Sequence, residues 1–229
     1  MTDELRDVHV TRWGSGPPVV LVHGGTPQGG AVAFAAQEPL AQRWTLLLPD
    51  RPGHGGTPAA GREDFERDAD LLLPLLDPAG AHLVGHSYGA VVALVMAARR
   101  PEAVRSLIVI EPPAFCFARD TPVVAAMAKE NRRLFEDPPD DPAVLLKDFF
   151  ALTGIPAPTQ LPDPLPPPLA RVAASFGDIR GPYEAEIDAA PLRDAGFPML
   201  VLTSGRVPGF DSSPRLSGSR GNRVDRWLR

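Results

Sequence analysis

The stretch A-H-L-V-G-H-S-Y-G, residues 81–89, decides the fold of this chain. It begins with an apolar run, 81–84, and is followed by residues 90–100, which are rich in alanine and valine and free of proline. This order predicts a buried strand, a tight turn centred on Ser87 and a helix. Because such a turn brings strand and helix into contact, the positions two residues before and after Ser87 must be almost free of side chain, and both are glycines.

The G-x-S-x-G pattern also predicts chemistry. A turn of this shape holds the Ser87 hydroxyl clear of the backbone and directs the first N–H groups of the next helix toward whatever the hydroxyl attacks. A serine hydroxyl is a weak nucleophile, so it needs a base, a carboxylate to orient that base, and two N–H donors for the developing oxyanion. We nominate the backbone N–H groups of Tyr88 and Gly25 as these donors, with the adjacent Thr26 as an alternative.

Short apolar runs alternate with helical segments along the chain. Strands are expected at 8–13, 18–22, 44–48, 81–84, 106–110 and 197–203, and helices at 30–43, 64–76 and 90–100. This alternation predicts an α/β fold, with a mostly parallel central sheet and helices on both faces. Such sheets carry their sites at the carboxyl ends of the strands. Gly25, Ser87 and Glu111 each follow an expected strand, so all three are predicted to lie on one rim.

Four parts of the chain are expected. Residues 1–111 form the first part of the core, 112–190 an inserted cap or lid, 191–204 the last recognisable core strand, and 205–229 a tail of different character. We interpret the insertion as a lid that excludes water and shapes the pocket, with a merely structural excursion as the alternative.

Proline and glycine punctuate the expected cap. Thr121-Pro122 and Asp141-Pro142 each predict a helix start, and Gly154 predicts the end of the second helix. Seven prolines between residues 156 and 168 argue against regular structure there, and two short helical pieces are expected at 169–176 and 183–190.

Four motifs together resemble the α/β-hydrolase superfamily, specifically its small cofactor-free enzymes with a helical cap. They are H-G-G at 23–25, D-R-P-G-H-G at 50–55, G-H-S-Y-G at 85–89 and I-E-P-P at 110–113, and the resemblance spans about residues 8–204. It implies an eight-stranded, mostly parallel sheet and no cofactor, and the sequence itself shows no cluster of metal-binding residues. It also implies a catalytic triad in the order Ser, acid, His. Glu111 fits the acid, and Asp211 in the tail is the alternative.

The histidine of that triad is missing from its expected place. All five histidines, at positions 9, 23, 54, 82 and 86, precede Ser87. Only His54, on a predicted rim loop, has a place from which a base can reach over the rim, and its alternative role is to brace the loop.

The amino-acid composition changes in the C-terminal segment, where the triad order places the histidine. Residues 205–229 hold six arginines, two aspartates and no alanine, for a net charge of +4 against −9 for the rest of the chain. We hypothesise a shifted reading frame near residues 204–206, with a genuine truncation that leaves a non-catalytic relative as the competing explanation. Retranslation of the DNA in the other frames distinguishes the two.

The predicted function is hydrolysis of esters, thioesters or lactones, impaired here because no histidine follows Ser87. Two alternatives stay open: an inactive relative that kept the pocket for ligand binding, and a cofactor-free haloperoxidase-like perhydrolase. The apolar, proline-rich cap favours a small hydrophobic substrate.

Composition narrows the partners and the location. The net charge is −5 without a basic stripe before residue 205, which argues against nucleic acid. No apolar run approaches the roughly 20 residues of a membrane span, and the acidic, polar start is unlike a signal peptide. The single cysteine, Cys116, rules out an internal disulfide and is a poor nucleophile candidate without a nearby base, so a cytoplasmic location is expected.

Overall fold

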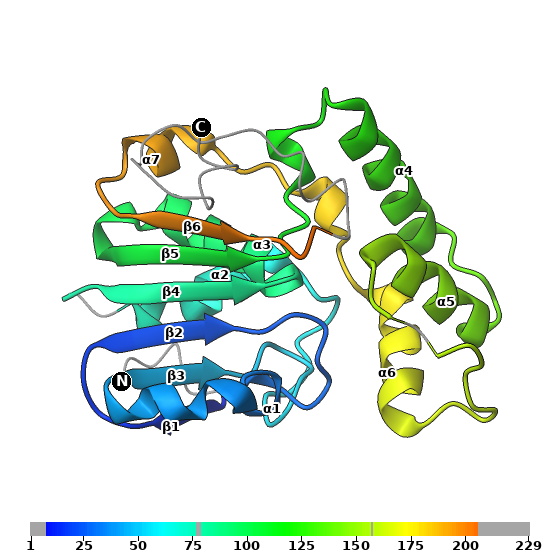
Figure 1. Ribbon diagram of the computed structural model, residues 1–229, viewed down its shortest axis with the longest axis horizontal. Coiled ribbons are helices and arrows are strands. Elements are labelled where there is room, and N and C mark those ends of the chain that lie inside the picture. Colours follow the sequence, from blue (N-terminus) through cyan, green and yellow to red (C-terminus); the bar gives the residue numbers. More distant parts are fainter. Residues whose placement is uncertain (1–7, 77–78, 157, 206–229) are drawn as a thin grey trace.

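A six-stranded sheet forms the centre of the computed structural model, which describes residues 8–76, 79–156 and 158–205 (Figure 1). The strands lie in the order β1-β3-β2-β4-β5-β6, with β1 antiparallel to β3 and every other neighbouring pair parallel. Their bounds are β1 Val10–Trp13, β2 Pro18–Val22, β3 Thr45–Pro49, β4 Ala81–His86, β5 Val104–Ile110 and β6 Met199–Leu202. The predicted mostly parallel sheet is confirmed.

Helices cover both faces of the sheet, as the sequence predicts. On one face, α2 (Phe65–Leu72), α3 (Tyr88–Arg99) and α7 (Ala189–Asp194) share a hydrophobic core with the strands. On the other face, Phe34 at the end of α1 (Gly30–Ala33) packs with the opposite side chains of the strands. The split follows the two-residue period of a strand, because Val20 and Val22 join the α3 core while Leu21 joins Phe34.

Helices α4 (Pro122–Glu136), α5 (Pro142–Thr153) and α6 (Pro167–Ser175) lie beyond the carboxyl ends of the strands (Figure 1). They share a small hydrophobic core of their own, which includes Leu134, Leu146 and Phe176. The expected punctuation of α5 is confirmed: the Asp141 carboxylate accepts a hydrogen bond from the N–H of Ala143 at 2.8 Å, and Gly154 ends the helix with a φ of 64°. Thr121 takes the N-cap position of α4, but its side chain makes no capping hydrogen bond.

Two helix predictions need correction. The expected helix at 30–43 is the short α1 followed by a 3₁₀ segment, Ala35–Gln42, because Pro39 lacks the N–H that an α-helix needs at that point. The expected helix at 183–190 does not form. A 3₁₀ turn, Pro182–Glu184, takes up its first two residues, and α7 begins only at Ala189, where the Asp188 side chain caps it.

Smaller differences concern segment ends. The helix α6 begins at Pro167, inside the segment expected to be irregular, because proline is well suited to the first turn of a helix. The last strand is shorter than expected. The remaining 3₁₀ turns are Leu73–Leu75, Pro101–Ala103, Phe115–Phe117 and Phe176–Asp178.

Some expectations fall beyond the described residues. The predicted tail lies there except for Gly205, and so does Asp211. The resemblance implies eight strands, whereas the residues from 8 to 205 that are described form six. None of the helices in this part of the chain has the length and apolarity needed to cross a membrane.

Candidate functional site

Ser87 stands alone between a strand and a helix. The strand β4 ends at His86, α3 begins at Tyr88, and Ser87 between them has a φ of 53°. A positive φ in a residue other than glycine costs of order 1–3 kcal/mol and persists only where the surroundings impose it. Here the N–H of Ser87 donates to the carbonyl of Ile110 at 2.8 Å, and its own carbonyl accepts from the N–H of Ala90 at 2.8 Å.

The two flanking glycines leave no room for a side chain. A Cβ on Gly85 would lie 2.4 Å from the carbonyl oxygen of Gly89, and a Cβ on Gly89 would lie 2.3 Å from the carbonyl oxygens of Val22 and His23. The predicted need for glycine on both sides of Ser87 is therefore confirmed. The close approach of Gly89 to the carbonyls of Val22 and His23 also packs the start of α3 against the end of β2.

The loop after β2 runs beside Ser87. A Cβ on Gly24 would lie 2.9 Å from the Cβ of Ser87, whereas a Cβ on Gly25 would meet no atom within 4 Å. Gly25, Ser87 and Tyr88 border one cavity, so the structure brings together the predicted nucleophile and the two predicted oxyanion donors. The N–H of Thr26, the alternative donor, is engaged with the carbonyl of Gly24 at 2.9 Å. The catalytic roles of these residues stay predictions.

Glu111 follows β5 with a φ of 48°, the other positive value outside glycine in the described chain. Its N–H donates to the carbonyl of Leu202 at 2.8 Å, and its Oε1 accepts from the N–H of Ser204. Its Oε2 is buried and has no hydrogen-bond partner among the described residues. The carboxylate therefore keeps one oxygen available for a donor.

A buried ion cluster, Arg51 with Asp68 and Glu63, lies beneath the loop after β2. Arg51 has no exposed surface, and its Nη1 donates to Asp68 at 2.9 Å and to Glu63 at 3.1 Å. Its Nε and Nη2 donate to the carbonyls of His23 and Gly24, each at 3.1 Å. Because Arg51 binds both of these carbonyls, the loop after β2 is fixed in the position in which Gly25 borders the cavity.

Sequence reasoning missed this cluster. The motif at 50–55 predicts a glycine-rich loop and no more, and the partners of Arg51 lie in other segments. One signal was available: Asp68 stands on the apolar face of α2 with Phe65, Ala69 and Leu72. A carboxylate in such a position predicts a buried cation opposite it.

Burial and charge shift the pKa values in the cluster in different directions. Burial raises the pKa of Asp68, and the attraction of Arg51 only partly offsets it. Burial acts the same way on Glu63, but hydrogen bonds and charge from His54 and Arg51 outweigh it and lower the pKa of Glu63. Burial lowers the pKa of His23 well below its usual value, and Arg51 adds to this, so the ring is neutral at pH 7.

His54 borders the cavity, but both of its ring nitrogens already have partners. Its Nδ1 lies 3.1 Å from the carbonyl of Thr26, and its Nε2 lies 3.1 Å from Glu63 and 3.2 Å from Arg51. This arrangement fits a residue that braces the loop, not a base for Ser87.

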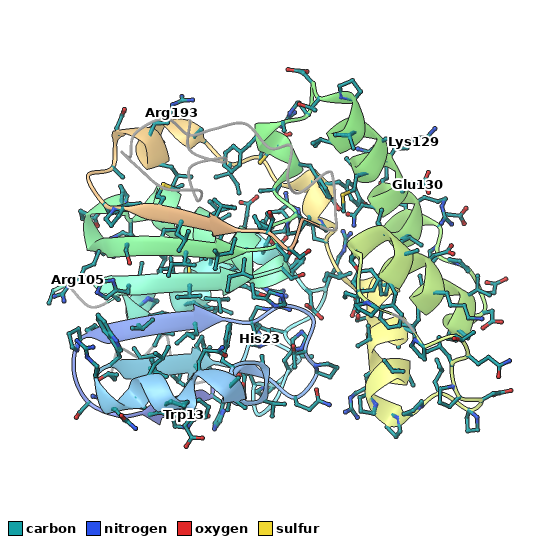
Figure 2. All side chains as sticks on the ribbon, in the orientation of Figure 1. Trp13, His23, Arg105, Lys129, Glu130 and Arg193 are labelled. Atoms are coloured by element: carbon teal, nitrogen blue, oxygen red, sulfur yellow. The ribbon has the colours of Figure 1, made fainter. Side chains whose placement is uncertain are left out.

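Three other histidines also contact polar groups of the protein. His23, just beyond β2 (Figure 2), contacts the carbonyl of Gly24 through Nδ1 at 2.7 Å. His9 contacts Asp50 at 2.8 Å, and His82 contacts Ser106 at 2.7 Å. Within the described residues no hydrogen bond joins a histidine to the Ser87 hydroxyl.

The cavity above Ser87 has a volume of about 370 Å³ and is enclosed by both parts of the fold. Gly25 and Ser87 border it from the strand ends, and Met127, Phe149 and Phe176 border it from the cap. A molecule that fills it must have a largely apolar body. In the described part of the chain no group of three or more His, Cys, Asp or Glu side chains is arranged to hold a metal ion. Burial raises the pKa of the Cys116 thiol.

The sequence is similar to a known protein family and to curated proteins. Residues 17–204 match the family model described as alpha/beta hydrolase fold. The chain is 41% identical over 104 residues to the pimeloyl-(acyl-carrier protein) methyl ester esterase of Chromobacterium violaceum, which covers 45% of this chain and 40% of that protein. It is 36% identical over 110 residues to lipase LipV of Mycobacterium tuberculosis, which covers 46% of this chain and 42% of that protein.

The fold is also similar to that of a solved structure. An alpha/beta hydrolase from Sphaerobacter thermophilus is similar with a TM-score of 0.55 and 27% identity, over 89% of this chain and 80% of that one. The matches to both curated relatives span less than half of their length.

Proposed function

Because the chain belongs to the alpha/beta hydrolase fold family, we propose that it is built for serine-dependent hydrolysis of carboxylic esters, with thioesters and lactones as related substrates. The observation that carries this proposal is the strained position of Ser87, which opens on an apolar cavity beside Gly25 and Tyr88. Two relatives are named as a methyl ester esterase and a lipase, and these names support the same substrate class.

In the proposed reaction the Ser87 Oγ bonds to the substrate carbonyl carbon while its proton passes to a base. The carbonyl oxygen becomes anionic and accepts hydrogen bonds from the N–H groups of Gly25 and Tyr88. When the carbonyl re-forms, the bond to the alcohol breaks and the alcohol takes up the proton. Water then attacks the acyl-serine in the same way and releases the acid.

The base is the weak point of this mechanism in the present chain. In the triad order that the family implies, Glu111 orients a histidine, and no histidine follows Ser87. Loss of one triad member lowers turnover by about 10⁴–10⁶-fold. A ligand-binding relative without turnover is therefore the second candidate, favoured because no histidine among the described residues is hydrogen-bonded to Ser87.

A fluorophosphonate probe with a mass-spectrometric readout separates the two candidates. For a serine hydrolase we expect covalent labelling of the intact protein, mapped to the peptide that contains Ser87 and abolished in Ser87→Ala. Ser106→Ala, which changes an ordinary hydroxyl bonded to His82, is the matched control and is expected to label normally. A folded protein that stays unlabelled would favour the ligand-binding relative.

Free imidazole is expected to restore part of the missing base. A positioned base contributes about 10²–10⁴-fold, and a mobile imidazole should recover part of this, with labelling of Ser87 about tenfold faster. In the proposed arrangement one ring nitrogen would accept the serine proton, and the N–H of the other would donate to Oε2 of Glu111, which has no partner among the described residues.

Two comparisons test this arrangement. Methylimidazole substituted on nitrogen has no N–H for Glu111, so it should accelerate labelling less than imidazole does, and Glu111→Gln should reduce the gain from imidazole. Equal acceleration by both compounds, in both proteins, would argue against Glu111 as the orienting acid.

A further inference from the structure

Asn131 breaks the apolar pattern of α4. The buried residues of this helix recur at the spacing of one helical face, and one of the four carries an amide: Val124, Met127, Asn131 and Leu134. Lys129 and Glu130 lie on the outer side of the helix (Figure 2), whereas Asn131 is only 5% exposed.

The amide of Asn131 is not satisfied by the protein around it. Its Oδ1 is buried and has no hydrogen-bond partner among the described residues. Leaving such a group unpaired costs about 1–3 kcal/mol, whereas leucine at this position would carry no such cost. Stability of the cap therefore does not explain an asparagine here.

Asn131 borders the same cavity as Ser87. Met127 and Phe135, one helical turn on either side of it, form the neighbouring wall. The amide of Asn131 therefore interrupts an otherwise apolar wall. The part of a bound molecule that extends away from Ser87 would contact this wall.

Other polar side chains of the cap wall differ from Asn131 because their hydroxyls are used. The hydroxyl of Thr153 donates to the carbonyl of Phe149 at 2.8 Å, and the hydroxyl of Ser175 donates to the carbonyl of Val172 at 2.8 Å. The Oδ1 of Asn131, in contrast, has no hydrogen-bond partner among the described residues.

We propose that Oδ1 of Asn131 accepts a hydrogen bond from a neutral donor, an amide N–H, in the part of the substrate remote from its ester carbonyl. The inference rests on the proposed function for the ester end at Ser87. A carboxylate brings no proton to Oδ1, and an ammonium group would lose its hydration between apolar side chains. An amide N–H supplies the missing donor and leaves the rest of the molecule apolar.

Calorimetric binding to the Ser87→Ala protein tests this without any turnover. The ligands are the methyl esters of N-acetyl-ε-aminocaproate and N-acetyl-γ-aminobutyrate, each with its N-methyl analogue, which has the same amide without the N–H. For at least one of the two chain lengths, N-methylation is expected to weaken binding about tenfold when Asn131 is present. In the same protein with Asn131→Leu the two ligands should bind alike.

Controls keep the result interpretable. Thr153→Val changes a polar residue of the same wall and should leave the N–H preference intact, and Asn131→Ala repeats the test should leucine disturb the cap. An N-methylation effect that is equal with and without Asn131, or no binding of any amide ligand, would overturn the proposal. Tighter binding of monomethyl azelate would also overturn it, in favour of an anion near Arg171, which borders the same cavity.

The outcome is independent of the serine chemistry. Binding that depends on Asn131 in a protein whose Ser87 never labels would count against the proposed hydrolase and leave the amide site standing. Normal labelling without any role for Asn131 would support the hydrolase and rule out the amide site.

Discussion

Replacing Arg51 by methionine is expected to lower the free energy of unfolding by about 3–5 kcal/mol, because it leaves buried carboxylates without their cation. Asp68 is fully buried and Glu63 is 14% exposed, and both depend on Nη1 of Arg51. The change also removes the cation from the ring of Tyr88, whose centroid lies 4.6 Å from the guanidinium carbon. Urea unfolding at pH 7 measures the loss.

The pH dependence identifies the cause. Without the cation, Asp68 and Glu63 should take up protons in the folded state at a higher pH than in the unfolded state. The deficit is therefore expected to shrink as the pH falls, since protonation removes the uncompensated charge. An apolar partner provides a second check: adding Asp68→Leu to Arg51→Met should recover part of the lost stability.

Arg99→Met is the matched control. Arg99 also bridges two carboxylates, those of Glu66 and Asp70, but its side chain is 33% exposed and both partners are more exposed still. Solvent screens such pairs, so this substitution should cost only a small fraction of the Arg51 loss. Equal losses at the two positions would contradict the idea that Arg51 holds the loop after β2 in place.

Local patterns are enough to predict the parts of the molecule that depend on neighbours in sequence. The strand, turn and helix around Ser87 follow from an apolar run, two glycines and a proline-free segment, and the sheet follows from the repetition of that arrangement. The start and end of α5 are predictable for the same reason, because Asp141 and Gly154 act on the residues beside them.

Contacts between distant segments are out of reach of such patterns. Arg51 meets Glu63 and Asp68 only after β3 and α2 have packed, so the pattern of one segment does not disclose the cluster. The unpaired oxygen of Glu111 likewise depends on the segment after β6, because the N–H of Ser204, two residues beyond that strand, donates to the other oxygen.

The expected helix at 30–43 is a different kind of error. The signal against it is local, since Pro39 stands within the segment, and its missing N–H outweighs the helix propensity of the surrounding alanines. Asn131 stands between these two kinds: its place on an apolar helical face can be read from the sequence, but its lack of a partner cannot.

Gly89→Ala is expected to destabilise the fold by about 3 kcal/mol, the upper end of what overpacking costs. Alanine usually favours a helix over glycine, so propensity alone predicts the opposite sign. The sterics decide otherwise, because the new methyl group would lie 2.3 Å from two backbone oxygens, those of Val22 and His23. These belong to β2 and the loop after it, whose side chains are buried and have little room to move.

The same substitution should suppress labelling of Ser87 by the fluorophosphonate. To relieve the contact, the start of α3 must move away from the loop after β2, which separates the N–H of Tyr88 from that of Gly25. Misplacement of one oxyanion donor costs about 10²–10³-fold in rate. Thermal unfolding and the labelling rate, measured on the same sample, report the two effects separately.

Gly177→Ala serves as the control of opposite sign. Gly177 lies in the 3₁₀ turn after α6, and an added Cβ would meet no atom within 4 Å. Alanine there should leave labelling unchanged and stabilise the protein by about 0.4–1 kcal/mol, because it restricts only the unfolded chain. If Gly89→Ala were equally benign, the backbone at the end of β2 would have to yield by several tenths of an ångström, and the geometry around Ser87 would not depend on that contact.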